Sequence, residues 1–186
     1  MLKSECRQLM LSKRNALSTS ECTKLDDLLL IQFQRLDWSE INCVGSFYPM
    51  ESKNEPDTLL LTKFLKAILP EVTIAYPKIN DDNSMTFYAE TNDLVENKWG
   101  IPEPMPVTEI LIEQMDVILV PLICFDLLGQ RVGFGKGYYD QYFGNHTGFV
   151  NKIGISYFEP IPKIEDTNQF DVPLSKCITP WKIYEF

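Results

Sequence analysis

The chain has little of what nucleophilic and zinc enzymes need. Among 186 residues there is one histidine, His146, and the five cysteines form no CxxC pair. A Ser-His-Asp triad needs a histidine at the site, and a zinc site needs closely spaced Cys or His ligands. His146 stands beside Gly144 and Asn145, which is typical of a surface loop. The sequence therefore favours chemistry that uses neither triad nor zinc, and the scattered cysteines suit a reducing cytosol.

Long apolar runs and excess positive charge are also missing. No apolar segment approaches the roughly 20 residues needed to span a bilayer. The first ten residues are charged and lack a small-residue cleavage site, so we expect no secretory signal, no membrane partner and a cytoplasmic protein. With 17 basic and 26 acidic residues the net charge is −9, which argues against nucleic acid as a partner. An anionic ligand must be bound by local cations.

The most informative stretch of the chain is 116–143. An apolar run, Val117–Phe125, predicts a buried strand. A polar turn follows at Asp126–Gln130, and then three glycines stand at alternate positions: Gly133, Gly135 and Gly137. Glycine lets the backbone adopt left-handed angles and expose its N–H groups to a ligand.

Charged residues in the same stretch favour an anion site. If a helix begins at Tyr138, its positive end faces the loop. Arg131 and Lys136 add cations, and Asp140 is a candidate ligand for a divalent metal. The P-loop and dinucleotide patterns both fail here, because Gln130 and Tyr138 stand where glycine is required. Glycines alone would fit a tight structural connection equally well.

These residues carry a resemblance to a known family. The segment VPLICFDLLGQRVGFGKGYYDQYF resembles the signature VP-x-x-x-FD-x-x-G-x-R-[LV]-G-x-G-x-G-YYD of 5-formyltetrahydrofolate cyclo-ligase, also called methenyltetrahydrofolate synthetase. The resemblance implies a single domain over residues 1–186 with an α/β fold, a three-layer α/β/α sandwich with a mostly parallel central sheet. It also implies ATP-dependent closure of 5-formyltetrahydrofolate to 5,10-methenyltetrahydrofolate, with release of ADP and phosphate and with Mg²⁺ as cofactor.

The alternation of helical and strand patterns independently favours an α/β sheet covered on both faces. Helices are expected at 2–17, from a capping box at 18–21 through about 36, at 57–69, and from 138. Strands are expected at 41–47, 72–76, 85–88, 117–125, 152–157 and around 177–179.

The first helix carries Lys3, Arg7 and Arg14 on one face, and the pattern alone favours a solvated basic surface. In the family this helix has the form K-x-x-x-R and contacts ATP; Lys3 and Arg7 match it, and Arg14 matches a further basic position less closely. The resemblance implies catalytic roles for Arg131 and Lys136. The implied ATP-binding residues are Lys3, Arg7, Arg131, Val132, Gly133, Phe134, Gly135, Lys136, Gly137, Tyr138 and Tyr139, and among them Phe134 is given no role toward the phosphates.

The folate side is implied by three further segments. Glu55 fits a family glutamate that contacts folate, although Glu51 is an alternative, and a first-turn acid favourable to the helix dipole is the structural reading of Glu55. Trp99 adjoins a segment that resembles the family's GI-x-EP and either stacks on the pterin or covers a core edge. The implied substrate-binding residues are Tyr48, Glu55, Trp99, Phe134, Gly135, Lys136, Gly137 and Tyr138.

The metal ligands implied by the resemblance are Asp140 and Asp171. Asp171 falls in a segment similar to the family's C-terminal HD-x-x-[LM]-[DT], but Phe170 replaces the histidine. Asp171 is therefore either a second Mg²⁺ contact or a structural loop residue.

Two other functions stay open from the sequence. One is a non-catalytic folate- or nucleotide-binding module. The other is a sugar-phosphate isomerase on a related fold, which would use Asp140 as a base and leave Lys3 and Arg7 unexplained. The expected partners are 5-formyltetrahydrofolate and ATP, and we expect a monomer.

Overall fold

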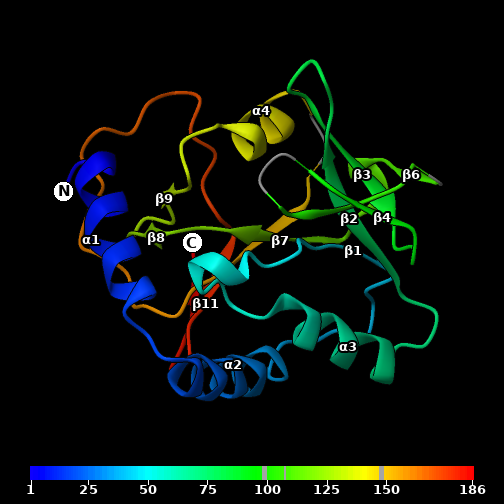
Figure 1. Ribbon diagram of the computed structural model, residues 1–186, viewed down its shortest axis with the longest axis horizontal. Coiled ribbons are helices and arrows are strands. Elements are labelled where there is room, and N and C mark those ends of the chain that lie inside the picture. The colour runs from blue at the N-terminus through cyan, green and yellow to red at the C-terminus, as the bar shows by residue number, and fades with distance from the viewer. Residues whose placement is uncertain (98–99, 107, 147–148) are drawn as a thin grey trace.

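A mixed eight-stranded sheet forms the centre of the computed structural model, which describes residues 1–97, 100–106, 108–146 and 149–186 (Figure 1). The strand order is β12-β11-β10-β7-β1-β2-β3-β6. The strands from β11 to β2 are parallel, while β12, β3 and β6 pair antiparallel at the two edges. The sheet strands are β1 (Cys43–Gly45), β2 (Thr73–Ile79), β3 (Met85–Ala89), β6 (Glu109–Ile110), β7 (Val117–Pro121), β10 (Asn151–Ile155), β11 (Lys176–Ile178) and β12 (Ile183–Glu185). The predicted, mostly parallel sheet is confirmed.

Helices cover both faces of this sheet, as a three-layer sandwich requires. In Figure 1, α2 and α3 lie below the sheet and α4 lies above it, while α1 stands at one side next to the β8–β9 hairpin. The helices are α1 (Lys3–Asn15), α2 (Thr19–Phe33), α3 (Thr58–Ile68) and α4 (Tyr138–Gly144), with 3-10 turns η1 (Glu51–Lys53) and η2 (Ile112–Gln114). Small two-stranded sheets are formed by β4 (Leu94–Glu96) with β5 (Pro102–Pro104) and by β8 (Cys124–Phe125) with β9 (Arg131–Val132). None of the helices in the described ranges is long and apolar enough to cross a membrane.

The central strand β7 shows why the sheet is buried on both sides. Its alternate residues point to opposite faces. Leu119 packs with the α2 and α3 residues Leu29 and Leu61, whereas Ile118 packs with Phe143 of α4. An apolar run without alternation is therefore the expected sequence of this strand.

Helix starts follow their local capping signals. The Ser18 hydroxyl accepts from the Glu21 amide, and the Glu21 carboxylate accepts from the Ser18 amide at 2.8 Å, which confirms the capping box. At α3, Asp57 caps the amides of Leu59 and Leu60. The end of α2 was predicted too late, because the helix stops at Phe33 and the chain continues as turns.

The expected single strand over residues 117–125 is wrong. β7 ends at Pro121, whose nitrogen carries no hydrogen to continue the ladder. The carbonyl of Leu122 accepts instead from Arg14 Nη1 at 3.1 Å, and Cys124 and Phe125 turn away to pair with β9. This break moves the chain from the sheet to the hairpin that carries the glycine-rich loop.

Gly154 on β10 provides a test of the packing around this break. A Cβ atom there would lie 2.6 Å from Leu122, 2.7 Å from Leu174 and 3.1 Å from Cys177. We expect Gly154→Ala to lower the free energy of unfolding by about 1–3 kcal/mol through overpacking, measured by urea denaturation. Gly144→Ala is the control, since a Cβ there meets nothing within 4 Å. Equal urea midpoints for parent and Gly154→Ala would contradict this packing.

Candidate active site

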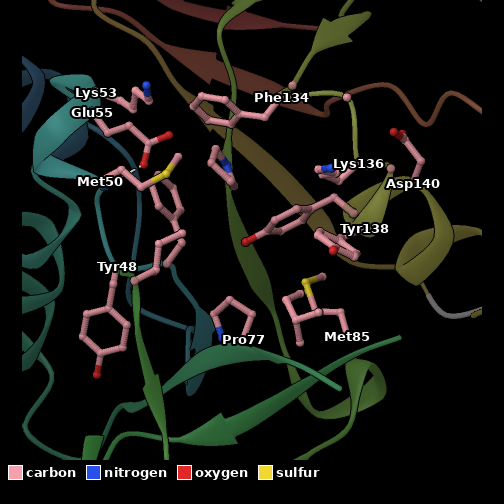
Figure 2. A pocket seen from close by; sticks show the side chains of 18 of the residues that line it. Tyr48, Met50, Lys53, Glu55, Pro77, Met85, Phe134, Lys136, Tyr138 and Asp140 are labelled. Carbon is pink, nitrogen blue, oxygen red and sulfur yellow. Dashed lines mark hydrogen bonds between the residues drawn. The ribbon is translucent and has the colours of Figure 1, made fainter. Parts of the chain in front are cut away.

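A cavity of about 620 Å³ opens where β1, β2 and β7 end. Ligands of open α/β sheets bind at this carboxyl edge. Figure 2 shows two unlike walls: an apolar wall with Met50, Pro77 and Met85, and a wall that carries Lys136 and Asp140. The cavity therefore joins a surface suited to an apolar ring with one suited to a charged group.

The glycine-rich loop requires glycine at two of its three positions. Gly135 and Gly137 have φ angles of 93° and 74°, which L side chains rarely adopt. A Cβ on Gly135 would also lie 3.4 Å from the Arg7 guanidinium. The carbonyl of Gly133 accepts from Arg7 Nε at 2.8 Å, so α1 holds this loop directly. Gly137 is the N-cap of α4, which begins at Tyr138 as the sequence predicts.

Two predicted cations of the cavity are paired with the two predicted metal ligands. Lys3 Nζ donates to both carboxylate oxygens of Asp171 at 2.6 Å. Arg131 Nη2 donates to Asp140 Oδ1 at 2.7 Å. In the described part of the chain, the exposed Lys136 ammonium has no such partner and is available to an anion.

Arg131 is less accessible than an arginine that binds a phosphate would be. Its side chain is only 5% exposed, and it donates to Asp140 and to the Val172 carbonyl. Burial lowers the pKa of Arg131, and the Asp140 carboxylate opposes that shift. As it stands, Arg131 orients Asp140; its direct contact with a phosphate stays a prediction.

Asp140 and Asp171 come close along two segments that are far apart in sequence. Asp140 Oδ1 accepts from the Val172 amide at 3.1 Å, so the residue after Asp171 touches the Asp140 carboxylate. Both aspartates line the cavity. Asp140 fits a metal ligand, because Oδ1 is anchored and its side chain is 32% exposed. Asp171 fits less well, since Lys3 engages both of its oxygens and the Asn168 amide also donates to it.

No group of three or more His, Cys, Asp or Glu side chains suited to a metal occurs in the described residues. Mg²⁺ nevertheless needs only one or two carboxylates when a substrate phosphate and water complete its shell. A metal that binds here would therefore depend on the phosphate for much of its coordination.

The structure favours Glu55 over Glu51 as the glutamate predicted on the folate side of the cavity. Glu55 is 8% exposed and lines the cavity, whereas Glu51 is exposed in η1. The Met50 amide donates to Glu55 Oε2 at 2.9 Å. Glu55 precedes the Asp57 cap and does not belong to the first turn of α3, so the helix-dipole reading is wrong.

Tyr48 also lines the cavity, and its ring stacks on the Tyr76 ring with centroids 4.1 Å apart. Burial raises the pKa of Tyr48 to about 12, so the phenol is neutral. Trp99 lies outside the described residues.

Several lining residues carry no signal that sequence reasoning used. Pro77 and Met85 belong to the β2–β3 pair, and Ile101 and Pro102 lie at the start of β5. Glu103 also lines the cavity and accepts from the Ile79 amide at 3.2 Å. The contact of β5 with β2, joined by the Glu103–Ile79 hydrogen bond, brings the β5 residues to the cavity, and the GI-x-EP resemblance pointed to their neighbourhood.

The fold and the site together define an α/β protein whose cavity at the strand ends has one wall suited to a charged group and another suited to an apolar one. The model of the 5-formyltetrahydrofolate cyclo-ligase family matches residues 1–180. The chain belongs to this family, which implies folate and ATP as substrates.

Curated relatives and solved structures agree with this assignment. The 5-formyltetrahydrofolate cyclo-ligase of Mycoplasma pneumoniae is 33% identical over 162 residues, which cover 84% of this chain and 86% of that protein. The Aquifex aeolicus 5,10-methenyltetrahydrofolate synthetase, solved by NMR, has a TM-score of 0.83 and 30% identity, over 100% of this chain and 93% of that one. The structure of a Mycoplasma pneumoniae 5,10-methenyltetrahydrofolate synthetase has a TM-score of 0.75 and 30% identity, over 96% and 98% of the two chains.

The positive φ angle of Gly135 generates a prediction for nucleotide binding. We expect Gly135→Ala to raise the KM for ATP by about tenfold or more, because the strained angle costs about 1–3 kcal/mol and displaces the loop from Arg7. The measurement is ATP-dependent turnover, with melting temperature as a check on folding. Gly144→Ala, at the end of α4, is the matched control. An unchanged KM for ATP in folded Gly135→Ala would mean that the loop does not hold the nucleotide.

Proposed function

We propose that this chain is an ATP-dependent cyclo-ligase that converts 5-formyltetrahydrofolate to 5,10-methenyltetrahydrofolate, with release of ADP and phosphate. The observation that carries the proposal is the cavity with two unlike walls. One wall has the exposed Lys136 and the glycine-rich loop held by Arg7, and the other has apolar side chains with the buried carboxylate of Glu55. Phosphate and a reduced pterin need these two environments side by side.

The reaction explains why a histidine or cysteine nucleophile is unnecessary. The oxygen of the formyl group on N5 is a poor leaving group. Transfer of the γ-phosphoryl group of ATP to this oxygen converts it to a phosphate ester, and N10 then attacks the formyl carbon. Loss of phosphate and of the N10 proton leaves the methenyl bridge. The protein contributes position and charge stabilisation to such a transfer.

The cationic wall supplies those contributions. Lys136 stabilises charge that develops on the transferred phosphoryl group, and Arg7 keeps two donor nitrogens beyond the one that binds the Gly133 carbonyl. Arg131 holds Asp140 in place at the end of the loop. The apolar wall fixes the pterin so that N10 faces the activated carbon.

The Mg²⁺ implied by the family would be held by Asp140. When bound, Mg²⁺ neutralises phosphate charge and orients the phosphoryl oxygens. Asp171 would join Asp140 only if Lys3 moved from the Asp171 carboxylate to a phosphate. Lys3 and Asp171 are then a pair whose members change partners when the substrate binds.

Family membership favours this proposal over both alternatives left open by the sequence. A non-catalytic module would bind folate without forming product. A sugar-phosphate isomerase would use Asp140 as a base and would leave Lys3 and Arg7 without a role toward a nucleotide.

The experiment is to mix the purified protein with 5-formyltetrahydrofolate, ATP and Mg²⁺ and to record absorbance at the methenyl-folate band. We expect absorbance to rise only when all three are present, with one ADP formed per product. Absence of product, or product without ATP, would overturn the proposed function.

Removal of the Lys136 ammonium should affect the chemical step more than folding. We expect Lys136→Met to lower kcat by about 10²-fold or more, as seen when a group that stabilises transition-state charge is removed. The control is Lys24→Met, an exposed lysine on α2. Turnover of Lys136→Met within a few-fold of the parent would show that Lys136 only solvates the loop.

A Mg²⁺ titration separates the two aspartates. We expect Asp140→Asn to raise the Mg²⁺ concentration needed for half-maximal turnover more than Asp171→Asn does, because Lys3 engages both oxygens of Asp171, whereas Arg131 engages only Oδ1 of Asp140. Binding of Mg²⁺-ATP by calorimetry provides a readout that does not depend on turnover. An unchanged Mg²⁺ dependence in Asp171→Asn would make Asp171 a structural residue, and an unchanged dependence in Asp140→Asn would refute the proposed ligand.

A further inference from the structure

Arg14 occupies a different environment from the other basic residues of α1. Its side chain is 4% exposed and does not line the cavity. Nε donates to the Lys53 carbonyl at 2.8 Å and Nη1 donates to the Leu122 carbonyl at 3.1 Å. The guanidinium also stands 5.6 Å from the Phe134 ring centroid. Arg14 therefore joins α1, η1, the end of β7 and the glycine-rich loop, and the expectation that it is a further ATP contact does not fit this position.

The remaining nitrogen of Arg14 faces the buried carboxylate of the cavity. Nη2 lies 3.8 Å from Glu55 Oε1, which is close enough for charge attraction but too long for a hydrogen bond. Neither of these two atoms has a hydrogen-bond partner in the described residues. Figure 2 shows one oxygen of the Glu55 carboxylate on the Met50 side, with the other directed into the cavity. The Met50 amide fixes Oε2, so the buried Oε1 is the oxygen that still lacks a donor among the described residues.

The charge of Arg14 opposes the effect of burial on Glu55. Burial raises the pKa of Glu55, and the Met50 hydrogen bond and the Arg14 charge both oppose this shift. The phenol of Tyr139 and the ammonium of Lys53 are the other titratable groups around the carboxylate, and the Tyr139 hydroxyl is buried without a partner in the described residues. Without Arg14, the buried carboxylate would lose its nearest positive charge, and its neutral form would be favoured.

We propose that Arg14 is a positioning residue for folate recognition, which places its positive charge beside Glu55 so that Oε1 accepts from the ring N–H and amino donors of the pterin. An ionised acceptor binds such donors more strongly than a neutral carboxyl group does. Arg14 acts through Glu55 and touches neither substrate. The inference rests on the proposed function, because it takes a reduced pterin as the ligand of the apolar wall.

A double-mutant cycle tests the link between the two residues. The variants are Arg14→Gln, Glu55→Gln and the double variant, and the KM values for 5-formyltetrahydrofolate and for ATP are measured separately. We expect each single variant to raise the folate KM by about tenfold or more and to leave the ATP KM within about threefold. The double variant should resemble Glu55→Gln alone, because Arg14 has no carboxylate to act on in that background. Multiplied effects in the double variant, or a rise confined to the ATP KM, would overturn the inference.

A second substitution controls for loss of stability in Arg14→Gln, because Arg14 also donates to two backbone carbonyls. Arg14→Lys keeps the charge, and we expect its folate KM to lie between those of the parent and Arg14→Gln. If the melting temperature shows that Arg14→Gln is unfolded, the same cycle is measured with Arg14→Lys, and additivity there overturns the inference. A parent protein that forms methenyl-folate but gives an additive cycle refutes only the role of Arg14. A parent that neither converts nor binds 5-formyltetrahydrofolate refutes the proposed function itself.

Discussion

The ion pair between Arg131 and Asp140 joins the two ends of the glycine-rich loop. One partner stands at the start of the loop and the other in the first turn of α4, and Nη2 donates to Oδ1 at 2.7 Å. With both ends fixed, Gly135 and Gly137 can keep their left-handed angles. A mostly buried pair is costly to break, because the remaining charge has no partner. The conformation of the wall that carries Lys136 depends on this pair.

Helix α1 completes the site from outside the sheet. Arg7 binds the carbonyl of Gly133, and Lys3 binds the carboxylate of Asp171 near the C-terminal end. Lys3 and Arg131 are thus paired with the two aspartates of the cavity, whereas the exposed Lys53 and Lys136 have no ion-pair partner among the described residues. In the proposed function, Lys3 exchanges the Asp171 carboxylate for a phosphate, which limits the cost of desolvating an isolated charge.

Local features could be predicted from the sequence, whereas long-range pairings could not. The cap at Ser18, the start of α4 at Tyr138 and the parallel sheet follow from short patterns or periodicity. Family resemblance placed Glu55 at the cavity. The pairing of Lys3 with Asp171 spans 168 positions, and the burial of Arg14 depends on carbonyls of two other segments, so no helical pattern of α1 contains either fact. The same limit explains why one apolar run was taken for a single strand across the break after β7.

The account holds that the cationic loop and the apolar wall lie in one cavity so that a phosphoryl group can move from nucleotide to formyl oxygen. The most direct test is to supply 5-formyltetrahydrofolate with a heavy oxygen isotope in the formyl group and to locate the label after turnover. Transfer to that oxygen predicts that the label appears in the released inorganic phosphate. Label found in water, with unlabelled phosphate, would contradict the account.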